Sequence, residues 1–171
     1  IQLLLDKIVQ KTDKYPSLWQ ERILIRTASA LHDIGKIGID EAILNKPGRL
    51  TAEEFESMKA HTTIGADMLR NLPRYQEERL LQIAIEICRW HHERYDGKGY
   101  PDGLVGDEIP ISAQLVSIAD VYDALTSERV YKKAFSHEKA MQMIREGECG
   151  AFNPLLLSCL EEIADELQAE M

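Results

Sequence analysis

Apolar residues recur along the chain at intervals of three and four, and this periodicity constrains the fold more than any other feature. In the segment from Tyr75 to His92, for example, Leu80, Ile83, Ala84 and Ile87 fall on one face of a helix. Short segments rich in Ser, Asn, Pro and Gly separate such stretches and supply the usual signals for helix starts and ends. The pattern predicts an all-α bundle of about six to eight helices.

These start and stop signals also predict the helix boundaries. Thr51 and Glu54 form a capping box, and Asn153 followed by Pro154 marks the start of the last helix. Residues 34–50 and 93–110 contain several glycines and prolines and are expected to be mostly loop. The expected helices are Leu3–Asp13, Ser17–Leu31, Thr51–Leu72, Tyr75–His92, Ser112–Thr126, His137–Gly147 and Pro154–Ala169.

Length and charge limit the classes of function. A chain of 171 residues suits one domain with a single core. Its formal net charge is −9, from 20 basic and 29 acidic residues, which disfavours binding to a nucleic-acid polymer or to an acidic membrane surface. Three widely spaced cysteines without a CxxC pair indicate reduced, buried thiols and therefore a cytoplasmic location. A small phosphate ligand could still bind at a local cationic site.

Histidines and aspartates stand where predicted helices end or face the centre of the bundle. The pattern is His32-Asp33, then His61, then His91-His92, then Asp120. Any one of these histidines would more often be an ordinary core or surface residue, but packing alone does not explain the whole set, because buried imidazoles and carboxylates need partners. First-row divalent metals supply such partners, and the lack of thiolates favours iron or manganese, with zinc and nickel as alternatives.

Several segments resemble the HD-GYP family. They are LHDIGKIGI from Leu31, ILNKPGRLTAEEFESMKAHTTIGADML, HHERYDGKGYPDG from His91, and SIADVYDALTSERVYKKAF, and together they cover nearly all of the chain. The resemblance implies an HD-domain helical bundle that holds two or three divalent metal ions. It also implies that the enzyme hydrolyses cyclic di-GMP to linear pGpG, with GMP as a further product. The implied metal ligands are His32, Asp33, His61, His91, His92 and Asp120.

The resemblance assigns roles to further residues. Asp33 would bridge two metal ions, and Lys36 would face the scissile phosphate, although a solvated loop lysine would have the same sequence. Arg129 and Lys132 match positions that hold substrate phosphates; the alternative is a basic turn after a helix. The loop with Gly99, Tyr100 and Pro101 would border the site and could contact a partner, such as a cyclase domain.

Three residues near the motifs have open roles. Glu93 could orient a metal ligand or form a salt bridge with Arg94 or Lys98. Asp123 could accept a hydrogen bond from a metal ligand or serve as a cap or turn partner. His137 follows a predicted cap and is expected at the surface.

Members of the family also take a histidine from a helix that precedes the segment with which this chain starts. No histidine precedes His32 here, and the chain begins at Ile1 inside an apolar pattern. We therefore expect a single HD-GYP domain over residues 1–171, truncated at its N-terminus and belonging to a larger signalling protein with a receiver or sensory domain upstream. One metal position is in doubt for this segment.

Two other functions compete with hydrolysis of cyclic di-GMP. The first is a catalytically silent receptor that binds the dinucleotide and signals through the GYP loop. The second is an HD phosphohydrolase acting on another nucleotide; the GYP motif and the pair Arg129 and Lys132 argue against it.

Overall fold

The computed structural model describes residues 1–128 and 133–170. Within these ranges the chain is helical, and the only bridge between extended segments joins Asp96 and Val105, so the predicted all-α class is confirmed. The α-helices are α1 (Gln2–Lys11), α2 (Leu18–Ser29), α3 (Glu41–Leu44), α4 (Ala52–Lys59), α5 (His61–Arg70), α6 (Arg79–Trp90), α7 (Ile111–Thr126), α8 (His137–Arg145), α9 (Pro154–Glu162) and α10 (Ala164–Ala169). Short 3-10 helices are η1 (Ile34–Gly38), η2 (Pro73–Tyr75) and η3 (Gly106–Glu108).

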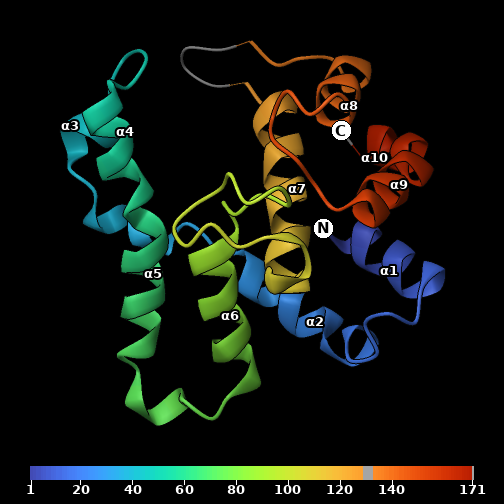
Figure 1. Ribbon diagram of the computed structural model, residues 1–171, viewed down its shortest axis with the longest axis horizontal. Helices are drawn as coiled ribbons and strands as arrows, with labels where there is room; N and C mark the ends of the chain where they lie inside the picture. The colour runs from blue at the N-terminus through green and yellow to red at the C-terminus, as the bar shows by residue number, and fades with distance from the viewer. Residues whose placement is uncertain (129–132, 171) are drawn as a thin grey trace.

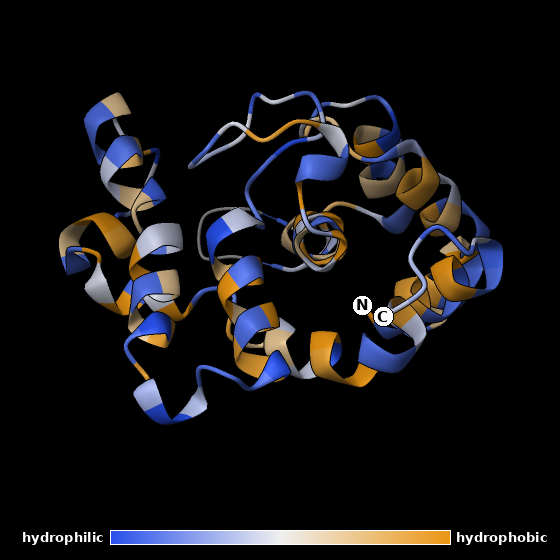
Figure 2. Cartoon of the chain, turned by 60° about the horizontal axis from the view of Figure 1, so that its bottom comes forward, coloured by the Kyte–Doolittle hydropathy of each residue, from blue (hydrophilic) through white to orange (hydrophobic). Residues whose placement is uncertain are grey.

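Helix α7 runs through the middle of the bundle (Figure 1). Its residues Ala113, Leu115 and Ile118 are fully buried. Helix α6 packs against α7, α2 and α5 on one side, and α1 packs against α9 on the other. Figure 2 shows hydrophobic residues gathered around α7, where the other helices face it. Burial of these apolar side chains is the main force that holds the helices together.

The structure differs from several of the expected boundaries, and α6 begins at Arg79 rather than at Tyr75. The expected helix from Thr51 to Leu72 is divided at Ala60 into α4 and α5, and the last helix is divided at Ile163 into α9 and α10. Residues 34–50, expected to be mostly loop, contain η1 and the short helix α3. The caps are confirmed, since Thr51 and Glu54 form their capping box and Asn153 accepts a hydrogen bond from the Leu155 amide.

Close packing of η1 against α5 positions two parts of the histidine and aspartate pattern. A Cβ atom on Gly35 would lie 1.9 Å from the carbonyl oxygen of His61 and 2.5 Å from the amide nitrogen of Gly65. Only glycine therefore permits this approach. The contact brings Asp33, at the start of η1, beside His61, at the start of α5.

Other sequence expectations concern the cysteines and the membrane. Cys88 and Cys159 are free, buried thiols, as expected, whereas Cys149 is only half-buried. Burial raises the pKa of Cys88 to about 12, so this thiol stays protonated. No helix within the described ranges has both the length and the apolar character needed to cross a bilayer.

Candidate metal centre

The predicted ligands come from four parts of the chain that meet at one end of α6. His32 and Asp33 follow α2, His61 is the first residue of α5, and His91 and His92 follow α6. Asp120 lies within α7, which packs against α6. Helix ends thus deliver the histidines, while the central helix supplies a carboxylate from its side.

Each of three histidines is fixed through the nitrogen that faces away from the centre. The Nδ1 atom of His32 donates to the carbonyl oxygen of Ser29 at 2.7 Å, that of His61 to Met58 at 2.7 Å, and that of His91 to Ile87 at 2.8 Å. These carbonyl groups lie in the last turns of α2, α4 and α6, where they accept the ring N–H in addition to a backbone N–H. With Nδ1 protonated, each Nε2 keeps a lone pair for a metal ion when the ring is neutral.

The three Nε2 atoms converge on the carboxylate of Asp33. The distances from Asp33 oxygens are 3.3 Å to His32, 3.4 Å to His61 and 3.8 Å to His91. The Nε2 atoms of His61 and His91 lie 3.4 Å apart. In the neutral rings both Nε2 atoms are acceptors, because the Nδ1 atoms carry the protons. Two acceptors pointing at one another repel, and a shared cation would remove that repulsion.

The donor set therefore fits a divalent metal ion. Asp33, His61, His91 and His92 each offer a ligand atom, and these atoms all lie within 4.8 Å of one another. His32 joins this group through Asp33 and also lies 3.6 Å from a carboxylate oxygen of Asp120. Imidazole and carboxylate donors without thiolates suit iron, manganese or zinc. We call these six residues the ligand cluster.

Burial keeps part of the ligand cluster neutral. It is the main cause that lowers the pKa of His91 to about 4 and that of His92 to about 2, and neighbouring histidines add to the effect. The pKa of His61 is also lowered, mainly by burial. Neutral imidazole is the form that binds metals, so these three rings are ready to act as ligands near pH 7.

His32 behaves in the opposite way. Burial alone would lower its pKa, but hydrogen bonds to Asp120 and Asp33 outweigh that effect and raise the pKa to about 10. The pKa values of both carboxyl groups are held below their usual range, despite burial, by contacts that include His32. Without a metal, a proton on His32 partly neutralises the two carboxylates, and a metal ion can take over that role.

Lys36 stands beside the ligand cluster, one turn of η1 beyond Asp33. Its Nζ atom lies 2.5 Å from a carboxylate oxygen of Asp33, and its side chain is partly exposed. A cation in this place can meet an anionic ligand that enters from solvent. Arg129 and Lys132, expected to hold phosphate groups, lie outside the described residues.

Comparison with known families agrees with this geometry. Residues 2–154 match the HD domain family. The chain belongs to the HD domain family.

The HD domain is similar to curated proteins over most of its length. A protein named cyclic di-GMP phosphodiesterase, from Vibrio cholerae serotype O1, is 46% identical over 147 residues, which are 85% of this chain and 30% of the relative. A protein named 3'3'-cGAMP-specific phosphodiesterase 2, from the same organism, is 42% identical over 87% of this chain and 28% of its own length. The chain thus spans about a third of the length of these relatives.

A solved structure supports the fold of the HD domain. It is Bd1817, described as an HDG"Y"P protein, from Bdellovibrio bacteriovorus. The TM-score is 0.63 at 22% identity, and the match covers 95% of this chain and 49% of the other. The expected HD-domain bundle and the resemblance to HD-GYP proteins are therefore confirmed.

The GYP loop of the HD domain, residues 97–105, contacts the ligand cluster through Tyr100, whose amide donates to the carbonyl oxygen of His92 at 3.2 Å. Tyr100 stacks on His92 with ring centroids 4.9 Å apart and an interplanar angle of 19°. A Cβ atom on Gly99 would lie 2.3 Å from the Arg94 amide nitrogen, so only glycine lets the loop pass this close to the backbone after the histidine pair. The loop therefore borders the site, as expected.

Glu93 fastens this loop, and both expectations for it are wrong. Its buried carboxylate accepts hydrogen bonds from the amides of Asp102, Gly103 and Leu104, at 2.7, 3.1 and 3.0 Å. It neither orients a metal ligand nor pairs with Arg94 or Lys98. The Arg94 guanidinium instead donates to the Ser117 hydroxyl at 2.8 Å. The Glu93 carboxylate binds backbone amides rather than charged side chains, because the turn after Pro101 directs those amides at the carboxylate.

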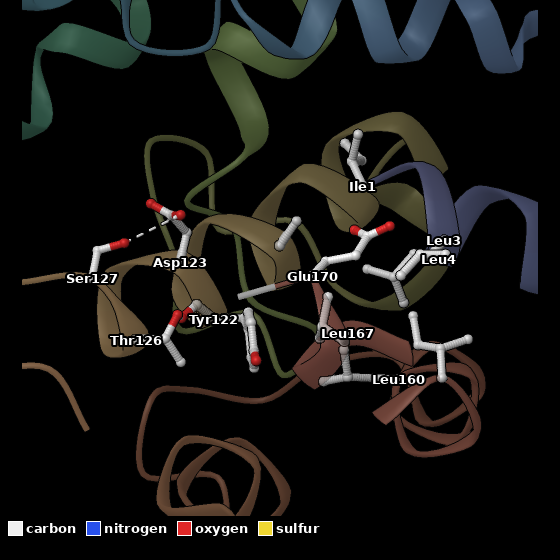
Figure 3. A pocket seen from close by; sticks show the side chains of 12 residues that line it. Ile1, Leu3, Leu4, Tyr122, Asp123, Thr126, Ser127, Leu160, Leu167 and Glu170 are labelled. Carbon is white, nitrogen blue, oxygen red and sulfur yellow. Dashed lines mark hydrogen bonds between the residues drawn. The ribbon is translucent and has the colours of Figure 1, made fainter. Parts of the chain in front are cut away.

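Two other residues do not join the ligand cluster. Asp123 accepts a hydrogen bond from Ser127 at 3.4 Å, on the wall of a cavity of about 390 Å³ that Ile1 also lines (Figure 3). It is thus a turn partner. His137 was expected at the surface, but it is buried, and its Nδ1 atom lies 2.8 Å from the Tyr122 hydroxyl. Its position at the start of α8, which packs on α7, explains the burial.

Sequence reasoning missed the groups that position the predicted metal ligands. The carbonyl acceptors of Ser29, Met58 and Ile87 belong to the backbone and leave no mark in residue type. One signal was available, because a histidine just beyond a helix end lies within reach of the carbonyl groups of the last turn. The stacking of Tyr100 on His92 likewise depends on how the GYP loop folds back.

Proposed function

We propose that this HD domain is the catalytic part of a metal-dependent phosphodiesterase that hydrolyses cyclic di-GMP to linear pGpG. The observation that carries the proposal is the convergence of three Nε2 atoms on Asp33, with Lys36 beside that carboxylate. The names of the similar Vibrio proteins support a cyclic dinucleotide as substrate.

Each part of the site has a proposed task. The ligand cluster would hold two or three divalent ions, iron or manganese in the first place, with Asp33 as the bridging carboxylate. Such ions supply positive charge to a phosphodiester and lower the pKa of a water molecule. The backbone carbonyl bonds of His32, His61 and His91 keep the Nε2 atoms of their rings directed at Asp33, where they would hold the ions. Lys36 would stabilise the negative charge that grows on the phosphate, and Arg129 and Lys132 are proposed to hold phosphate groups.

A second substrate, 3'3'-cGAMP, is favoured by the relative that carries this name. A receiver or sensory domain in the same polypeptide is also part of the proposal, since the similar proteins are about three times as long as this chain. A cyclase-domain partner at the GYP loop rests on the sequence resemblance alone.

Turnover by metal-loaded protein tests the proposed function. The protein is loaded anaerobically with Fe²⁺ or Mn²⁺, and cyclic di-GMP, 3'3'-cGAMP and other nucleotides are followed by chromatography. We expect pGpG from the wild type and a loss of more than about a hundredfold in Asp33→Asn, because the carboxylate shared by the histidines is gone. Asp13→Asn is the matched control, since Asp13 is exposed and distant in sequence from every predicted ligand.

Other outcomes favour the competing functions. Binding of cyclic di-GMP by metal-loaded protein without product would favour a silent receptor. Turnover of only a non-cyclic nucleotide would favour another HD phosphohydrolase. The appearance of GMP beside pGpG would show that a second bond is cut.

A further inference from the structure

A cavity of about 410 Å³ lies beside the ligand cluster, between the junction of α4 with α5 and the GYP loop. Its lining residues are Glu56, Lys59, Ala60, Thr63, Gly99, Tyr100 and Pro101. Ala60 directly precedes His61, and Tyr100 stacks on His92. The cavity wall is therefore adjacent in sequence to the predicted ligand His61. The Tyr100 ring connects the cavity to the predicted ligand His92.

The Tyr100 ring lines this cavity and contacts a second aromatic ring, that of Phe55, which stands outside the lining. Phe55 and Tyr100 contact edge to face, with ring centroids 6.2 Å apart, and Phe55 is 45% exposed. The ammonium group of Lys59 lies 5.1 Å from the centroid of Phe55 and 5.4 Å from that of Tyr100. An exposed aromatic surface with a cation beside it suits a flat, polar ring such as a nucleobase.

A carboxylate and an ammonium group stand side by side on the same wall. The Nζ atom of Lys59 lies 2.6 Å from a carboxylate oxygen of Glu56, whose side chain is 70% exposed. An ion pair this exposed contributes little to folding. Both groups remain accessible, so together they present one acceptor and one donor to a ligand in the cavity.

We infer that this cavity binds one guanine base of the substrate, with Glu56 and Lys59 as the residues that select guanine; the inference rests on the proposed function. Guanine presents two N–H donors and the O6 acceptor along its Watson–Crick edge, which complement a carboxylate and an ammonium group. Adenine places an amino donor where guanine has O6, and an acceptor where guanine has the N1–H donor. A flat base can rest against Tyr100 while its edge meets the ion pair.

The place of the cavity agrees with the shape of a nucleotide. A phosphate at the ligand cluster and a base in the cavity are joined by a single ribose, and the Tyr100 ring connects the two sites. Both proposed substrates, cyclic di-GMP and 3'3'-cGAMP, contain at least one guanosine. One guanine subsite therefore serves both of them.

The decisive experiment measures nucleotide selectivity without relying on turnover. Affinities of GMP and AMP for the Mn²⁺-loaded protein are compared by calorimetry. We expect GMP to bind about tenfold more tightly than AMP, since hydrogen bonds to charged groups are involved. Glu56→Gln should bring the two affinities close together, because the amide places a donor against the N–H groups of guanine. Glu53→Gln, an exposed change on the same helix outside the cavity, should keep the tenfold preference.

Kinetics with cyclic di-GMP provide a second test of the guanine subsite. Glu56→Gln should raise KM about tenfold with a smaller change in kcat, since the base lies away from the reacting phosphate. Equal binding of GMP and AMP by the wild type, or an unchanged preference in Glu56→Gln, would overturn the inference even if cyclic di-GMP is hydrolysed. A GMP preference that Glu56→Gln removes supports the subsite even if the proposed hydrolysis fails.

Discussion

Two polar clusters, one buried and the other partly buried, lie next to one another in this HD domain, and their partners differ. The carboxylate of Glu93, 2% exposed, accepts three backbone hydrogen bonds from the turn at residues 102–104. In the adjacent ligand cluster, the Nε2 atoms of His61 and His91 face one another and the carboxylate of Asp33. In the first cluster the protein itself supplies a donor for each acceptor, so we call it complete. The second is incomplete, because it gathers acceptors that need a cation. Burial alone therefore does not mark a functional group; the nature of its partners does.

Removing the carboxylate of the complete cluster should have the largest effect on stability. We expect Glu93→Ala to lower the free energy of unfolding by about 3 to 5 kcal/mol, because three buried amides lose their acceptor. Urea unfolding followed by circular dichroism measures the change. Glu77→Gln, an exposed carboxylate outside both clusters, should leave the midpoint unchanged. A similar midpoint for Glu93→Ala would mean that the turn at 102–104 satisfies its amides in another way.

The ligand cluster should stabilise the protein further only when metal is added. At a Mn²⁺ concentration one hundred times the dissociation constant, we expect the free energy of unfolding to rise by about 2.7 kcal/mol. His91→Phe should abolish most of this gain, because it removes a ligand from the centre of the cluster. Unfolding curves with and without metal provide the measurement, and Glu77→Gln again serves as the control. A gain that persists in His91→Phe would place the metal elsewhere.

The contrast between the clusters also shows what the sequence could and could not predict. Helical periodicity and caps were sufficient for the all-α class and for most helix boundaries. The pattern of His32, Asp33 and His61, together with the resemblance to the HD-GYP family, was sufficient to predict that they meet. The role of Glu93 was predicted wrongly because its partners are backbone amides, which every residue type except proline offers. The burial of His137 depends on how α8 packs against α7, which local sequence does not encode.

The pH dependence of metal binding should distinguish the members of the ligand cluster. His32, with its pKa raised to about 10, carries a proton near neutral pH that a metal must displace. His91 and His92, with pKa values lowered to about 4 and about 2, have no proton to lose above pH 6. Affinity for Mn²⁺ should therefore rise with pH, by up to about tenfold per unit between pH 6.5 and 8.5. Calorimetry at several pH values measures this, and a constant affinity would exclude His32 as a ligand.

The smallest expected effect belongs to a buried pair that resembles the Glu93 cluster rather than the ligand cluster. The Tyr122 hydroxyl and His137 Nδ1 lie 2.8 Å apart, and both residues are buried. Tyr122→Phe deletes this hydrogen bond and keeps the ring, so we expect a loss of about 1 kcal/mol in stability. Because neither residue belongs to the ligand cluster, Mn²⁺ affinity should stay at the wild-type value, although Tyr122 is only two residues from Asp120. Urea unfolding and calorimetry on the same samples test both statements. A marked loss of metal affinity would show that His137 helps to set the position of Asp120 through α7. The pair would then belong with the ligand cluster, and the division between complete and incomplete clusters would not hold for it.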